Sequence, residues 1–313
     1  MVPIELLREP IVLLACVFVY GLAFGSFLNV CIYRLPRGLS VVRPASACPS
    51  CDTPIKIYDN IPVLGWLLLR GKCRACREPI SPRYLFVELL TALLFVLSFY
   101  FFGLSLQAFK LSIFAFLLVG LIFTDADLKL LPDRLTLPGL AIGLILSAFT
   151  RVDGIAAFLF NPGAFPFAPE ITARILSVVN SVIGAVVGAG FIWLAGEAYK
   201  RVRGVEGMGF GDVKLMAMVG AFIGIKLTLL TLMLGSMSGA LAGGIAIMLV
   251  YRKRLRRRRA AGELSDAARN RAWQSAQLVM RHFEMPFGVF LGIAALIAGV
   301  FGQPFVDWYL GFF

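Results

Sequence analysis

The sequence predicts an all-α polytopic membrane protein, with about eight transmembrane helices and a small cytoplasmic zinc-binding module. The first observation is composition: 59% of the 313 residues are hydrophobic and the mean hydropathy is +0.85. Only 15% are charged, whereas a soluble domain carries about 25%. The second is a series of apolar runs, several of which approach or exceed the roughly 18 residues that cross a bilayer. The third is a pair of Cys-x-x-Cys motifs in the long polar segment between the first two runs.

The distribution of charge orients the predicted spans. Strict alternation places the loops 33–83, 125–134, 200–211 and 251–285 on one side of the membrane. Together with Lys214, that side carries 25 of the 30 lysine and arginine residues. By the positive-inside rule it is the cytoplasmic side, so both termini are expected to face outward. The net charge of +12 is then explained by topology, and we expect no nucleic-acid partner. The predicted spans are 10–32, 84–102, 107–124, 135–150, 176–199, 212–225, 227–250 and 286–306.

The chain is expected to divide into five parts. Within the basic cytoplasmic loop 251–285, Arg252–Arg259 is interpreted as a solvated anchor beside anionic lipid, and 260–284 has a helix-forming composition. No cleavable signal peptide is expected, because Met1–Pro10 contains two glutamates and lacks a basic n-region. The five parts are the first transmembrane helix (1–33), the four-cysteine zinc module (34–83), a transmembrane core (84–250), a basic cytoplasmic loop (251–285) and the last transmembrane helix (286–313).

Several residues in the first span are interpreted as packing residues. Gly25 and Ser26 are small enough to allow close helix contact in lipid. Asn29 is an amide in an apolar span, so it needs a hydrogen-bond partner, which a neighbouring helix could supply. Cys16 and Cys31 lie in or at the end of the same apolar run and are expected to pack rather than react.

Four cysteines in the polar segment have the pattern of a metal site. Cys48-x-x-Cys51 and Cys73-x-x-Cys76 are separated by 21 residues, slightly more than the usual spacer of a four-thiolate zinc site. Disulfide bonds are the alternative, but the cytoplasm keeps thiols reduced. A module this small also needs a staple in order to fold. We therefore expect these four cysteines to hold one structural zinc ion.

Two acidic clusters lie at the edges of predicted spans. In Gly207–Lys214, the motif Gly209-Phe-Gly-Asp212 leads into an apolar run, and Asp125–Asp133 follows another. Considered alone, Asp212 is explained as a helix N-cap. Two carboxylates brought together could instead share one proton, activate a water molecule and protonate a departing amine. A paired-carboxylate site is therefore the hypothesis to test.

An ordered set of motifs runs from the first span to the last. The set comprises Gly25-Ser-Phe-Leu-Asn-Val, the two Cys-x-x-Cys pairs, Asp59-Asn-Ile-Pro, Arg70-Gly-Lys-Cys, Ile80-Ser-Pro-Arg-Tyr, Val87-Glu-Leu-Leu, Asp125–Asp133, Gly207–Lys214 and Met285-Pro-Phe-Gly. In this order the motifs resemble those of the bacterial type IV prepilin leader peptidases, which are similar to the wider group of GxGD intramembrane aspartyl proteases. One departure is Phe210, where bacterial members commonly have glycine.

The resemblance implies two activities. The family cleaves the short basic leader of type IV prepilins and pseudopilins at the cytoplasmic face of the bacterial inner membrane. It then methylates the new N-terminal amine, usually that of phenylalanine, with S-adenosylmethionine. The resemblance assigns the catalytic dyad to Asp125 and Asp212. From the sign of their charge alone, nearby carboxylates such as Asp127, Asp133 and Glu206 are expected to draw the basic leader. The residues expected to shape the site or contact the substrate are Gly209, Gly211, Lys214, Asp127 and Asp133.

The methyl-transfer site is harder to place. No glycine-rich loop of a soluble methyltransferase follows a strand in this sequence. The resemblance points to the cytoplasmic module, where Gly71 and Lys72 directly precede the expected zinc ligand Cys73. Lys72 could meet the carboxylate of the methyl donor or could be an ordinary exposed lysine, and the sequence favours neither.

Two other classes of protein share some of these features. A transporter or channel with a zinc-stabilised domain also has intramembrane acids and glycine-broken helices. Against this class, no internal repeat is visible and the acids lie at span edges. A non-enzymatic scaffold for pilus or secretion assembly is the second alternative. A proteolysis assay with a co-expressed prepilin separates all three classes.

Overall fold

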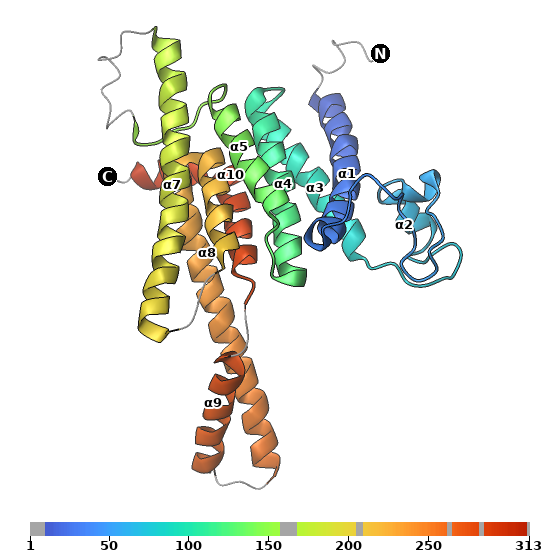
Figure 1. Ribbon diagram of the computed structural model, residues 1–313, viewed down its shortest axis with the longest axis vertical. Coiled ribbons are helices and arrows are strands. Elements are labelled where there is room, and N and C mark those ends of the chain that lie inside the picture. Colours follow the sequence, from blue (N-terminus) through green and yellow to red (C-terminus); the bar gives the residue numbers. More distant parts are fainter. Residues whose placement is uncertain (1–9, 157–167, 205–208, 262–264, 282–284, 312–313) are drawn as a thin grey trace.

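The computed structural model describes residues 10–156, 168–204, 209–261, 265–281 and 285–311. Within these ranges the regular elements are helices (Figure 1), accompanied by two isolated β-bridges, so the all-α prediction is confirmed. The helices are α1 (Pro10–Arg34), η2 (Leu35–Arg37), η3 (Ile57–Asn60), α2 (Leu64–Leu68), α3 (Arg83–Phe102), α4 (Leu106–Leu128), α5 (Asp133–Ser147), α7 (Pro169–Arg203), α8 (Phe210–Ala260), α9 (Ser265–Arg281) and α10 (Phe287–Leu310).

Five of the described helices are long and apolar enough to cross a membrane, namely α1 (continued by η2), α3, α4, α7 and α8. The apolar part of α10, Phe287–Gln303, is shorter, and α5 has 15 residues. α8 has 51 residues and an internal break, so it covers two of the predicted spans. The eight predicted spans thus correspond to α1, α3, α4, α5, α7, the two halves of α8, and α10. How many of these helices cross the bilayer stays a prediction.

The chain reverses direction inside α8 at Gly224, which has φ 71° and ψ 177°, a region that residues with a side chain rarely adopt. A Cβ atom on Gly188 of α7 would lie 2.6 Å from Met216 O and 2.9 Å from Thr228 Cγ2. Along a straight helix those two residues would be about 18 Å apart. The two halves of α8 therefore form a hairpin beside α7 (Figure 1). The predicted boundary between the sixth and seventh spans falls at this reversal.

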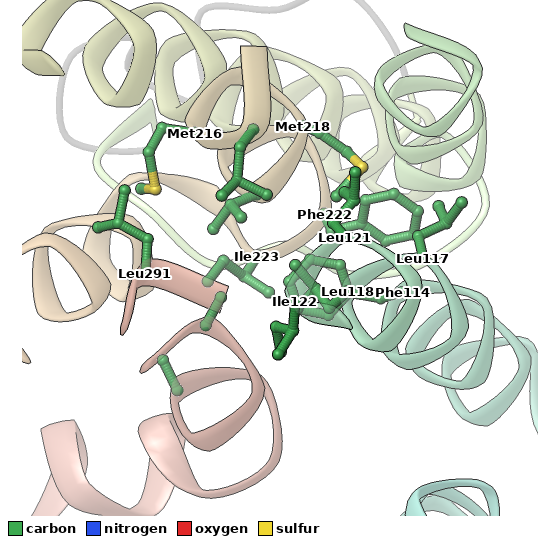
Figure 2. Packing of buried hydrophobic residues seen from close by; sticks show 14 of the residues in the cluster. Phe114, Leu117, Leu118, Leu121, Ile122, Met216, Met218, Phe222, Ile223 and Leu291 are labelled. Carbon is green, nitrogen blue, oxygen red and sulfur yellow. The ribbon is translucent and has the colours of Figure 1, made fainter. Parts of the chain in front are cut away.

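The largest apolar core lies between α4 and α8, and α10 closes one side of it (Figure 2). Phe114 of α4 stacks on Phe222 of α8 with ring centroids 4.9 Å apart. Leu121 and Met216, both fully buried in this core, lie one helical turn from the acidic residues at the end of α4 and the start of α8. Because such interiors are close-packed, the core fixes the two helix ends relative to each other.

α1 and α3 are in direct contact. A Cβ atom on Gly25 would lie 2.6 Å from the Cα of Glu88, which confirms Gly25 as a packing residue. The Asn29 amide donates a hydrogen bond of 3.0 Å to the backbone oxygen of Tyr84. The predicted need of this amide for a partner on a neighbouring helix is thus met by α3.

The basic stretch after the seventh predicted span continues as a helix. α8 runs without a second break to Ala260, and α9 packs back along its end, beyond the other helices (Figure 1). Tyr251 and Trp273 meet edge to face with centroids 5.8 Å apart. Ala268, Ala272 and Ala276 of α9 are fully buried. The part expected as a basic loop is therefore a helical hairpin in its described residues, in agreement with the helix-forming composition of 260–284.

Candidate active site and metal centre

The two expected catalytic aspartates lie at facing helix ends. Asp125 occupies the last turn of α4, and the helix ends where Lys129 adopts a left-handed conformation and donates its N–H to Asp125 O at 2.9 Å. Asp212 occupies the first turn of α8, three residues after the N-cap Gly209. Their exposed fractions are only 5% and 8%. Burial of two carboxylates in one apolar bundle is costly, which points to a function that uses both groups.

The two carboxylates converge on Gly288, at the start of α10. A Cβ atom on this glycine would lie 2.9 Å from Asp125 Oδ2 and 3.2 Å from Asp212 Oδ1. The backbone N–H of Val289 donates a hydrogen bond of 2.9 Å to the same Asp125 oxygen, which fixes that carboxylate in place. The sequence interpretation gave Gly288 no role in the site. Its only signal was the motif Met285-Pro-Phe-Gly, because nothing in the sequence shows that α10 begins beside α4 and α8.

The other carboxylates of the first cluster already have cationic partners. Asp127 pairs with Arg83, which joins α4 to the start of α3. Asp133, at the start of α5, accepts two hydrogen bonds from Lys214 Nζ, at 2.7 and 2.8 Å. These contacts agree with a role in shaping the site. They argue against attraction of the basic leader by Asp127 and Asp133, because each of these carboxylates already has a cationic partner. Glu206, the third carboxylate expected to attract the leader, lies outside the described residues.

The glycines of the GxGD motif leave room for the neighbouring loop. A Cβ atom on Gly211 would lie 3.1 Å from Leu131 Cβ, so a side chain would press on the loop between α4 and α5. A Cβ atom on Gly209 would meet little except Asp212 Oδ2, at 3.9 Å. The side chain of Phe210, where family members commonly have glycine, is 64% exposed and lies under Lys214 Nζ, 5.3 Å from the ring centroid. The departure at Phe210 therefore leaves the two aspartates undisturbed.

The four cysteines of the module lie together. The Sγ atoms of Cys48, Cys51, Cys73 and Cys76 are all within 4.8 Å of one another, and those of Cys48 and Cys76 are 3.8 Å apart. A tetrahedral zinc ion with Zn–S bonds of about 2.3 Å separates its sulfurs by about 3.8 Å, whereas a disulfide brings them to about 2.05 Å. All four cysteines are free thiols. The donor set and its spacing therefore fit a four-thiolate metal site.

Each Cys-x-x-Cys pair is held by the same backbone bonds. The N–H of Cys48 donates to Thr53 O at 3.0 Å, and the N–H of Cys73 donates to Glu78 O at 2.9 Å. The Thr53 hydroxyl, 3.2 Å from the Cys51 sulfur, lowers the pKa of that thiol to about 6. A sulfur that is ionised at neutral pH is the form that binds a metal. The two loops are thus matched halves of one site.

The residues expected to bind the methyl donor differ in their surroundings. Gly71 has φ +66°, and a Cβ atom there would lie 2.7 Å from the Trp66 ring. The Trp66 indole in turn donates to Ile80 O at 3.1 Å. Gly71 is therefore needed for the packing of the module. Lys72 is exposed, and its backbone pairs with Pro79.

A buried carboxylate ties the module to the membrane helices. Glu88 of α3 accepts a hydrogen bond of 2.7 Å from the backbone N–H of Val63, at the start of α2. Val63 has φ 64° and ψ −54°, and the next residue, Leu64, bonds back to Pro62 O at 2.6 Å. A β-branched residue in this region is strained, so the bond to Glu88 stabilises a turn that would otherwise relax.

A second carboxylate holds the module together internally. Asp59 binds the Arg74 guanidinium through both oxygens, at 2.8 and 2.6 Å, and the Asp59 side chain is 8% exposed. Hydrogen bonding from Arg74 holds the pKa of Asp59 below its usual value. Arg74 lies between the cysteines of the second pair, so the Asp59-Asn-Ile-Pro motif is clamped to the metal site.

A helical membrane bundle in which two buried carboxylates converge has the arrangement that aspartyl proteolysis requires. Residues 19–102 match the bacterial peptidase A24 N-terminal domain, and residues 111–244 match the type IV leader peptidase family. The chain belongs to the type IV leader peptidase family, as its motifs predict.

Curated relatives align over nearly the whole chain. A protein of Stutzerimonas stutzeri is 33% identical over 336 residues, covering 100% of this chain and 99% of its own length. One of Aeromonas hydrophila is 36% identical, covering 94% and 92%, and one of Pseudomonas aeruginosa is 34% identical, covering 98% and 97%. All three are named prepilin leader peptidase/N-methyltransferase. No solved structure matches the chain.

Proposed function

We propose that this protein cleaves the basic leader from type IV prepilins and pseudopilins, with Asp125 and Asp212 as the aspartyl dyad, and then methylates the new N-terminus with S-adenosylmethionine. The observation that carries the proposal is the convergence of both buried carboxylates on Gly288, in a chain whose relatives carry both activities in their names. Incubation of the purified protein with a prepilin, followed by mass spectrometry of the products, tests it. A transporter or an assembly scaffold releases no leader in that assay.

The chemistry follows from two like charges held close together. One carboxyl keeps its proton while the other is ionised. The ionised group accepts a proton from a water molecule as the water oxygen adds to the scissile carbonyl carbon. The protonated group then gives its proton to the departing nitrogen as the C–N bond breaks. The Val289 N–H holds the Asp125 carboxylate in position during these transfers.

The proposed active site faces the cytoplasm. Asp125 and Asp212 adjoin the loops 125–134 and 200–211, which lie on the basic side of the chain. The positive-inside rule assigns that side to the cytoplasm, and this is the side on which a basic leader is exposed. A substrate that spans the membrane as a helix would therefore present its scissile bond at the depth of the dyad. The protein is therefore proposed to be a multi-pass protein of the bacterial inner membrane whose active site opens to the cytoplasm.

The proposed methyl-transfer site lies on the zinc module. A bound zinc ion would supply structural cross-linking of the two cysteine loops. Lys72 is exposed and would bind the carboxylate of S-adenosylmethionine. Gly71 supports that lysine indirectly, because its place under Trp66 fixes the turn that carries Lys72.

Gly288→Ala is expected to lower leader cleavage by about a hundredfold or more. The added methyl carbon would lie 2.9 Å from Asp125 Oδ2, closer than such atoms approach, so at least one carboxylate must move. A misplacement of about 1 Å in a catalytic group costs a factor of this order. The rate of leader release, measured in membranes that contain equal amounts of protein, checks it.

Gly244→Ala in α8 is the matched control, because a Cβ atom there would meet nothing within 4 Å. It should retain wild-type cleavage. Wild-type activity of Gly288→Ala would contradict the placement of both reacting carboxylates beside this glycine.

Purified protein is expected to contain about one zinc ion per chain, the content of a single four-thiolate site. Cys48→Ser should lower the zinc content, because the Cys48 sulfur is one of the four that lie within 4.8 Å of one another. Cys16→Ser, outside this cluster, should leave it unchanged. Elemental analysis measures both variants. A disulfide among the four cysteines in freshly isolated protein would be incompatible with the site.

A further inference from the structure

A cavity with both polar and apolar side chains in its wall lies at the end of the bundle opposite the aspartates. Its volume is about 410 Å³, and its walls come from the end of α3, the start of α4, the segment after α5, the reversal in α8 and the C-terminal half of α10. Lys110 and Asp125 lie on the same helix, 15 residues apart, which corresponds to about 22 Å of helix rise. The cavity is therefore separate from the proposed peptidase site and from the zinc module.

Two groups in its wall lack the partners that burial demands. Lys110 is 2% exposed and donates a hydrogen bond of 3.1 Å to Thr150 Oγ1. No carboxylate among the described residues lies within ion-pair distance of its ammonium group; Asp153, also in the wall, pairs with Arg151 instead. Gln107 Oε1 is buried and accepts no hydrogen bond from any described residue. A buried charge without a counter-charge and a buried acceptor without a donor are both costly.

We propose that this cavity binds the headgroup of a phospholipid. The phosphate would neutralise Lys110, and a hydroxyl or amino group of the same headgroup would donate to Gln107 Oε1. One headgroup thus supplies both missing partners. A water molecule could satisfy Gln107 but would leave the lysine charge uncompensated.

The depth and the apolar walls favour a lipid over a free anion. Lys110 is the fifth residue of α4, so it lies about 6 Å of helix rise from the end of that membrane-spanning helix, near headgroup level. Phe102, Phe149 and Leu227 also line the cavity, and they offer surface for the upper part of an acyl chain. With the aspartates at the cytoplasmic side, the bound lipid belongs to the outer leaflet.

The test uses the delipidated full-length protein in detergent, with the thermal unfolding midpoint followed as short-chain phosphatidylglycerol is added. The lipid should raise the midpoint of the wild type. Lys110→Met should need at least about tenfold more lipid for the same rise, because a charged hydrogen bond is lost. Without lipid, Lys110→Met should be at least as stable as the wild type, because an uncompensated buried charge is removed. Lys226→Met, at the same end of the bundle but outside the cavity wall, should respond as the wild type does.

Two further ligands decide the source of the phosphate, and one further variant tests the site independently of Lys110. A short-chain diacylglycerol, which lacks a phosphate, should leave the wild-type midpoint unchanged, and so should inorganic phosphate. Gln107→Leu should weaken the lipid response independently, so the proposal remains testable if Lys110→Met does not fold. An equal lipid response in the wild type and Lys110→Met would overturn the site. A response to inorganic phosphate that depends on Lys110, with none to the lipid, would overturn the lipid as its ligand.

Discussion

Asp125→Asn and Asp212→Asn are each expected to lower the rate of leader cleavage by about a thousandfold or more, the scale seen when one member of a catalytic unit is removed. An amide can neither take the proton from the attacking water nor return one to the departing amine. The amide also preserves the shape of the side chain, so the buried packing around both positions should survive. Leader release from a co-expressed prepilin, compared at equal membrane content of each variant, provides the measurement.

Asp127→Asn and Asp133→Asn are the matched controls, because they remove neighbouring carboxylates of the same cluster. Each loses one ion pair, to Arg83 or to Lys214. Exposed pairs of this kind contribute about 0–1 kcal/mol, so both variants should keep at least partial activity. Full cleavage by either Asp125→Asn or Asp212→Asn would contradict the assignment of these two residues as the dyad.

Cys73→Ser is expected to lower N-terminal methylation of the processed pilin more than it lowers processing. The four sulfurs lie within 4.8 Å of one another, and in so small a module metal binding and folding are coupled. Loss of one ligand should therefore disorder the turn that carries Lys72. The two aspartates are held instead by the core between α4 and α8, against which Leu35, outside the cysteine loops, is the only described residue of the module that packs.

Mass spectrometry of the mature pilin N-terminus measures both activities in one sample. Cys16→Ser serves as the control, because it replaces a thiol outside the cluster and should leave both unchanged. Normal methylation alongside lost cleavage would reverse the proposed division between module and core. Equal loss of both would identify the module as a general scaffold.

Local patterns in the sequence predicted much of this architecture. Apolar runs predicted the helices, and paired cysteines predicted a metal site whose four sulfurs the structure brings together. The break at Gly224 falls one residue before the predicted end of the sixth span, because a glycine can take the backbone conformation that the reversal needs. The pairing of Asp125 with Asp212 was a hypothesis from two separate clusters, and their convergence on one glycine supports it.

Contacts between distant segments could not be predicted in the same way. Gly288 belongs to the site only because α10 begins beside two helices far from it in the sequence. The cationic partners of Asp127 and Asp133 come from α3 and α8. A local run of acidic residues does not show that these two charges are paired. No local pattern marks Lys110, because its burial depends on how five segments meet around one cavity.

The bond between Glu88 and Val63 sets the height of the zinc module. Glu88 lies five residues beyond Arg83, the first residue of α3, or about 7 Å of rise into that membrane helix. α2 therefore starts alongside the first turns of α3, where the side chains of Leu64, Leu67 and Leu68 are exposed. The module is thus attached to the side of the bundle at the α3 end that carries Arg83, the partner of Asp127. Under the proposed function, a pilin N-terminus freed at Asp125 and Asp212 would therefore have to move only sideways to meet the module.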